Sequence, residues 1–121
     1  MPEPCAPFED AVVETVAAEH GVDADVLREA IDSQQRIVRE FPDMTVEALV
    51  HNWRTAFPTD PLVETDATAY YLSVRETVWR DVAGRLDLSD GEREAVRTVN
   101  ARQFETSVGE AAEDVAVVLT K

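Results

Sequence analysis

Residues that support much of the chemistry of small domains are scarce in this 121-residue chain, which has one cysteine and four glycines. The single cysteine, Cys5, cannot form an intramolecular disulfide. Four glycines leave little room for a phosphate-cradling loop, and neither that loop nor a dinucleotide-binding fingerprint is present. No apolar run approaches the roughly 18 residues of a membrane helix, and no signal peptide begins the chain. We therefore expect a cytoplasmic protein that has no cofactor and no contact with a membrane.

Lysine is the rarest charged residue, because ten of the eleven basic residues are arginine and Lys121 is the only lysine. Asp and Glu together number 25, which gives a net charge of −14 at pH 7. This acidic, lysine-poor composition resembles the proteomes of salt-loving organisms. Molar salt shortens the Debye length to about 3 Å, which screens the self-repulsion of such an acidic domain. The composition predicts a halophile-type protein; a mimic of nucleic acid or a partner of a basic protein is the alternative.

The chain has the length of one domain, and the spacing of its apolar residues indicates helices throughout. Residues 1–7 are predicted to be a disordered or extended tail, and residues 8–121 a single all-α domain. Gly21 is expected to end the first helix. Asp23 and Thr45 should cap the next two, and Ser89 and Glu92 have the spacing of a capping box. The pattern predicts a compact bundle of about five helices, at residues 8–20, 23–40, 45–57, 66–86 and 90–119.

Residues 66–86 are predicted to be the helix around which the others pack. At about 100° per residue, Tyr71, Val78 and Leu86 fall on one apolar side. Arg75 lies within that side, one turn from Tyr71 and one turn from Trp79. One hypothesis is that Arg75 clamps neighbouring helices by pairing with a carboxylate or an aromatic face. The other is that Tyr71, Arg75 and Trp79 line a pocket or a partner surface, where aromatic residues and arginine are typical.

The last predicted helix, residues 90–119, keeps its apolar register through Gly109. A break near Ser107 is the first alternative, and a β-strand at VAVVLT is ranked last because no other segment offers it a pairing partner. Val117 and Leu119 extend the apolar side of this helix further than a monomer needs. We therefore expect a homodimer that forms through the C-terminal helix.

The stretch VAAEHGVDADVLREAI resembles a helix-turn-helix. Ala17, Gly21, Val22 and Leu27 occupy the positions that this motif gives to a small residue, a turn glycine and two apolar contacts. The resemblance implies a DNA-binding transcription regulator.

The residues that would read DNA in this motif are Arg28, Gln35 and Arg39, which share one stripe of the second helix. Most of the other residues on its exposed face are acidic, whereas phosphate contacts need Lys or Arg. A plain helical hairpin is the preferred interpretation, and nucleic acid is not the expected partner.

Three further residues have spacings that could mark special sites. Glu47 and His51 lie one turn apart on a helix, but a metal site needs three or four converging ligands, so we expect no metal. Gln34 lies on an apolar seam, either at its edge or as a buried polar group that fixes helix pairing. No motif marks a catalytic nucleophile, so an enzyme is not expected.

These patterns predict a small acidic cytoplasmic module that regulates or interacts with other proteins through helix-mediated association. A helix-turn-helix regulator is the first alternative. A small-molecule sensor or enzyme with a pocket beside Arg75 is the second.

Overall fold

Strands as well as helices appear in the computed structural model, which describes residues 8–39, 45–56, 60–86, 88–110, 112 and 114–120. The prediction of an all-α fold is wrong, because a three-stranded antiparallel sheet accompanies five helices in these residues. The tail at 1–7, with Cys5, lies outside them. None of the described helices is long and apolar enough to cross a membrane. The order is α1 (Asp10–His20), α2 (Ala24–Arg39), α3 (Val46–Ala56), β1 (Leu62–Thr65), β2 (Ala69–Val74), α4 (Glu76–Gly84), α5 (Asp90–Val108) and β3 (Val115–Thr120).

The first correction concerns residues 66–86, which form a strand followed by a helix and not one long helix. Strand β2 contains two tyrosines and a valine, residue types that favour strands. Arg75 ends the extended stretch and is the N-cap residue of α4, with φ −65° and ψ 153°. The charge inside the predicted apolar arc therefore lies at the junction between two elements, where it is exposed.

The second correction concerns residues 90–119. Helix α5 ends at Val108, and Gly109 follows in the left-handed conformation with φ 94°, which a glycine adopts at no steric cost. VAVVLT then forms β3, the interpretation that had been ranked last. Its pairing partner is β2, in register from Ala69 opposite Thr120 to Val74 opposite Val115. The break near Ser107 was the better of the two helical alternatives.

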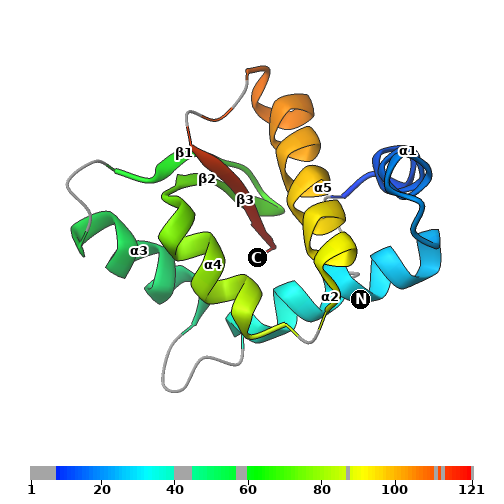
Figure 1. Cartoon of the computed structure of the whole chain (residues 1–121). Coiled ribbons are helices and arrows are strands. Elements are labelled where there is room, and N and C mark those ends of the chain that lie inside the picture. The colour runs from blue at the N-terminus through cyan, green and yellow to red at the C-terminus, as the bar shows by residue number, and fades with distance from the viewer. Residues whose placement is uncertain are drawn as a thin grey trace.

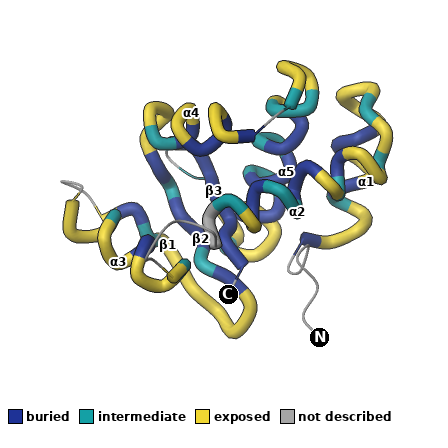
Figure 2. The backbone as a smooth tube through the Cα atoms, turned by 90° about the horizontal axis from the view of Figure 1, so that it is seen from below, coloured by how far each residue is buried: buried dark blue, intermediate teal, exposed yellow. Residues whose placement is uncertain are grey.

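All six residues of β3 are buried, so both faces of this strand are covered (Figure 2). On one face, Tyr71 of β2 packs edge-on against Phe104 of α5, with ring centroids 6.5 Å apart. Val117 and Leu119 belong to this core, so the apolar surplus that suggested a dimer is covered within the chain. Figure 1 shows α5 beside the sheet, α4 in front of it, and α1 and α3 at opposite ends of the molecule.

The predicted helix caps are confirmed. Gly21 follows α1 in the left-handed conformation, with φ 65°. The carboxylate of Asp23 accepts hydrogen bonds from backbone N–H groups in the first turn of α2, and the hydroxyl of Thr45 accepts one from the first turn of α3. Ser89 and Glu92 form the reciprocal capping box at the start of α5. Local hydrogen-bonding signals of this kind are visible in a sequence because both partners lie within one turn.

Side-chain amides protect the free edge of β3. Among the residues that the structure describes, the sheet order β1-β2-β3 leaves one edge of β3 without a strand. There the N–H of Val118 donates to Asn100 Oδ1 over 2.9 Å, and the carbonyl of Val118 accepts from Gln35 Nε2 over 2.9 Å. Gln34 is fully buried and exchanges two hydrogen bonds with Asn100. The interpretation that Gln34 lies at the edge of the apolar seam is wrong, because its side chain is buried and bonded to α5 of the same chain.

Candidate functional site between α4 and α5

Helices α4 and α5 follow one another in the chain, and a short connection between Gly84 and Asp90 places them near each other. The capping box fixes where α5 begins. Arg93 then reaches back from the first turn of α5 and donates from Nε and Nη2 to the carbonyl of Leu88, over 3.3 and 3.1 Å. Arg97 bridges to Glu76 in the first turn of α4. The contact between Arg97 and Glu76 joins the two helices, and a hollow lies between them.

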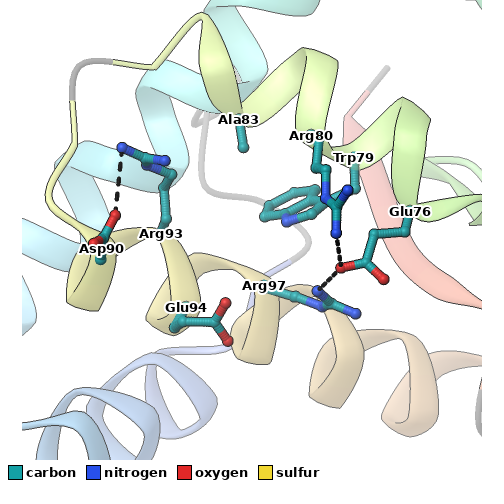
Figure 3. Close-up of a pocket in the computed structure, with 8 residues that line it drawn as sticks. All are labelled: Glu76, Trp79, Arg80, Ala83, Asp90, Arg93, Glu94 and Arg97. Atoms are coloured by element: carbon teal, nitrogen blue, oxygen red, sulfur yellow. Dashed lines mark hydrogen bonds and ion pairs between the residues drawn. The ribbon is translucent and has the colours of Figure 1, made fainter.

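The hollow has a volume of about 290 Å³. Its lining is shared equally by the two helices, as Figure 3 shows. We call it the α4–α5 groove, and its lining residues are Glu76, Trp79, Arg80, Ala83, Asp90, Arg93, Glu94 and Arg97.

The base of the groove is apolar. Trp79 is 4% exposed and Ala83 is 5% exposed, so their side chains are largely covered by neighbouring residues. In Figure 3 the indole of Trp79 lies between the two helices, with Arg93 on one side of it and the pair Arg80 and Arg97 on the other. The part of the groove that is open to solvent is therefore mainly its charged rim, with guanidinium groups at both ends of the buried indole.

The rim of the groove is a set of alternating charges. Arg80 and Arg97, from different helices, approach the same oxygen of Glu76, at 3.6 and 3.3 Å. Arg93 approaches Asp90 at 3.7 Å. These side chains are partly exposed to solvent, and ion pairs of this kind contribute about 0–1 kcal/mol each to stability. Since the pairs add little to the fold, the rim is free to exchange them for contacts with a partner.

The groove lies in the part of the chain that carries no net charge. Residues 75–102 contain six arginines and six acidic residues. The remainder of the chain contains five basic and nineteen acidic residues, and therefore carries the whole net charge of −14. The stretch of chain that supplies both walls of the groove is thus neutral, whereas the rest of the chain is acidic.

The structure separates the three residues of the predicted pocket or partner surface. Tyr71 is 2% exposed and lies in β2, where its hydroxyl donates to Asp66 over 2.8 Å. Burial and the neighbouring carboxylate of Asp66 raise the pKa of Tyr71. Arg75 is exposed at the start of α4, and only Trp79 lines the groove. A hollow beside Trp79 exists, but Arg75 and Tyr71 are not part of its lining.

The three residues of the DNA-reading alternative are not brought together on a surface either. Gln35 is 2% exposed, and both ends of its amide bind the backbone of β3. Arg28 lies among Asp10, Glu14 and Asp25, within 3.6 Å of each. Arg39 ends α2, and its side chain lies outside the described part of the structure.

The histidines are not grouped with other potential ligands. His20 contacts the hydroxyl of Thr98 at 3.1 Å, which links α1 to α5. Glu47 and His51 are exposed on α3. In the residues that the structure describes, no group of three or more His, Cys, Asp or Glu side chains could hold a metal ion.

The apolar spacing of the sequence points to Trp79 but not to the charged rim around it. One signal was available: Glu76 and Arg80 have the i, i+4 spacing of a helical ion pair, and Arg93 and Arg97 have the spacing of two residues on the same face of a helix. The other signal was the distribution of charge along the chain, because residues 75–102 contain equal numbers of acidic and basic residues.

Comparison with known proteins gives a family but no characterised relative. No curated protein and no solved structure matches the chain. The model of the family described as Domain of unknown function (DUF8048) matches residues 6–121. Because this match covers nearly the whole chain, the protein belongs to the DUF8048 family.

Proposed function

We propose that the domain is a small interaction module that associates with a protein through the α4–α5 groove, in the cytoplasm of a salt-loving organism. The observation that carries this proposal is the absence of net charge in residues 75–102, within a chain whose other residues carry −14. A generic acidic surface has no reason to collect six of the eleven basic residues in one helical pair.

The chemistry of the groove agrees with an association surface. Trp and Arg are the residue types most enriched among those that dominate binding energy at interfaces. Arg80 and Arg97 present donors around the indole of Trp79. Guanidinium groups pair with carboxylates in a planar, two-pronged geometry that lysine cannot offer. In molar salt such short contacts persist, whereas attraction over more than a few ångströms is screened.

A photo-crosslinking amino acid in place of Arg80 tests the proposal in an extract of the source organism at its native salt. The matched control carries the same amino acid in place of Arg54, which lies on α3 and pairs with Asp60. We expect a discrete protein adduct from position 80 and none from position 54. The adduct should disappear when Arg97→Glu is added, because that change reverses a charge on the opposite wall.

Equal labelling from the two positions would contradict the proposal, because it would mean that the adducts arise from random collisions. An adduct from position 80 that survives Arg97→Glu would also contradict it. Circular dichroism of each variant establishes that the helices remain folded.

A further inference from the structure

We infer that the partner in the α4–α5 groove is a second copy of this chain, related to the first by a two-fold axis. The inference rests on the proposed function, because it names the partner of the same groove. Its basis is the pattern of charges on the two helices, which is complementary to itself.

Each wall of the groove has an acidic residue before an arginine in chain direction. On α4, Glu76 precedes Arg80 by one turn. On α5, Asp90 precedes Arg93 and Glu94 precedes Arg97. A two-fold axis perpendicular to a helix places it antiparallel to its copy.

Antiparallel packing across an axis near the middle of the groove therefore brings the acidic residues of each wall towards the arginines of the same wall in the other molecule. Glu76 of one copy then faces Arg80 of the other, and the reverse pair forms at the same time. Because the groove holds three arginines and three carboxylates, two copies meet there without net repulsion.

The rest of the molecule disfavours self-association. Outside residues 75–102, nineteen acidic residues face five basic ones, so two copies that met elsewhere would bring like charges together. On α1, for example, Asp10 and Glu14 are both exposed, and Glu9 precedes them. Like charges placed opposite one another across an interface cost several kcal/mol and suppress wrong pairings. The neutral groove is thus the surface on which a second copy encounters the least repulsion.

The two arginines that share Glu76 give the second copy a specific role. Arg80 and Arg97 both approach one carboxylate oxygen within a single chain. Two guanidinium groups have more donors than one carboxylate can accept. A carboxylate from the second copy can take the place of the water that these exposed donors otherwise meet, and Glu94 lies on the same rim to provide it.

A pair of charge-reversed variants tests the inference, with molar mass measured by light scattering in 2 M KCl. The first variant, Arg80→Glu with Arg97→Glu, makes the groove acidic. The second, Glu76→Arg with Glu94→Arg, makes it basic. We expect the unmodified chain to have twice its mass of 13.4 kDa, each variant alone to be monomeric, and an equimolar mixture of the two to recover the doubled mass.

The control is Arg36→Glu with Arg54→Glu, which changes the net charge as much as the first variant but lies outside the groove. It should remain dimeric. A monomeric unmodified chain would overturn the inference, and so would charge-reversed variants that stay dimeric or a mixture that does not reassociate.

The result also separates this inference from the proposed function. If the unmodified chain is monomeric while position 80 captures a different protein in an Arg97-dependent way, the second copy is excluded and the groove remains an association surface. If position 80 captures nothing and dimerisation ignores the groove variants, both ideas are wrong.

Discussion

Asp66 organises the turn between β1 and β2 through its side chain. Its Oδ1 accepts hydrogen bonds from the backbone N–H of Thr68 over 2.8 Å, from the hydroxyl of Thr68 over 2.8 Å, and from the N–H of Ala69 over 2.9 Å. Its Oδ2 accepts one from the hydroxyl of Tyr71. Burial alone would raise the pKa of this carboxyl, but the donated hydrogen bonds outweigh it and lower the pKa to about 2.

This arrangement predicts a pH-dependent contribution to stability. Because the pKa is lower in the folded chain than the ordinary 3.8, the ionised carboxylate stabilises the fold above that value, and the contribution disappears as the pH falls towards 2. Asp66→Asn should therefore flatten the fall in urea midpoint over this pH range, measured at constant high salt. Tyr71→Phe removes one of the donors and should give an intermediate slope. Identical slopes for the wild type and Asp66→Asn would contradict the assignment.

Helix ends could be predicted from the sequence, whereas strand pairing could not. The caps at Gly21, Asp23, Thr45 and Ser89 depend on neighbours within one turn, so a short stretch of sequence contains the whole interaction. The register of β2 with β3 joins Tyr71 to Val118, which are far apart in the sequence. VAVVLT has the β-branched residues of a strand, but its partner lies inside a segment whose apolar spacing predicts a helix.

The prediction of one helix at 66–86 was wrong because, over a few residues, apolar positions in a strand can also fit the spacing of a helix. Val74, Val78 and Val82 fit a helical spacing, although the first lies in β2 and the others in α4. Arg75 within the apolar side was the visible conflict, and it marks the junction. For the site, the sequence identified Trp79 as an aromatic anchor. It could not identify the opposite wall of the groove, because α5 contributes that wall through tertiary packing.

The side-chain amides at the free edge of β3 join α2, α5 and the sheet, and they allow a further prediction. Asn100→Leu leaves the N–H of Val118 and the amide of Gln34 without their partner in the interior. Each such buried polar group costs about 1–3 kcal/mol when its hydrogen bond is lost. The free energy of unfolding, measured by urea titration, should fall accordingly. The control Asn52→Leu, at an exposed site on α3, should change it little.

A double variant distinguishes two causes of destabilisation between α2 and α5, namely lost hydrogen bonds and poor packing. Gln34→Leu with Asn100→Leu removes both amides, so only the N–H of Val118 is left unpaired. The double variant should be less destabilised than the sum of the two single variants, since each single change strands the other amide. Strict additivity would show that the two side chains contribute independently, contrary to the network in the structure.

At the scale of the whole molecule, the charge of −14 is opposed by ion pairs that join the helices. Arg102 of α5 pairs with Glu19 of α1, Arg97 of α5 with Glu76 of α4, and Arg28 of α2 with Glu14 of α1. With 25 acidic and eleven basic residues, carboxylates outnumber basic groups by more than two to one in the chain. The remaining carboxylates repel one another, and this repulsion acts across the domain.

We therefore predict that the domain loosens or unfolds as salt is removed, because the Debye length grows from about 3 Å at 1 M to about 10 Å at 0.1 M. The melting temperature, followed by circular dichroism, should rise with KCl but much less with sucrose, which excludes volume without screening charge. Glu29→Gln, Glu47→Gln and Glu64→Gln, combined at exposed positions, remove three negative charges and should weaken the salt dependence. A melting temperature that does not change with salt would exclude adaptation to salt as the reason for the acidic composition, and would leave acidic mimicry or a basic partner to explain it.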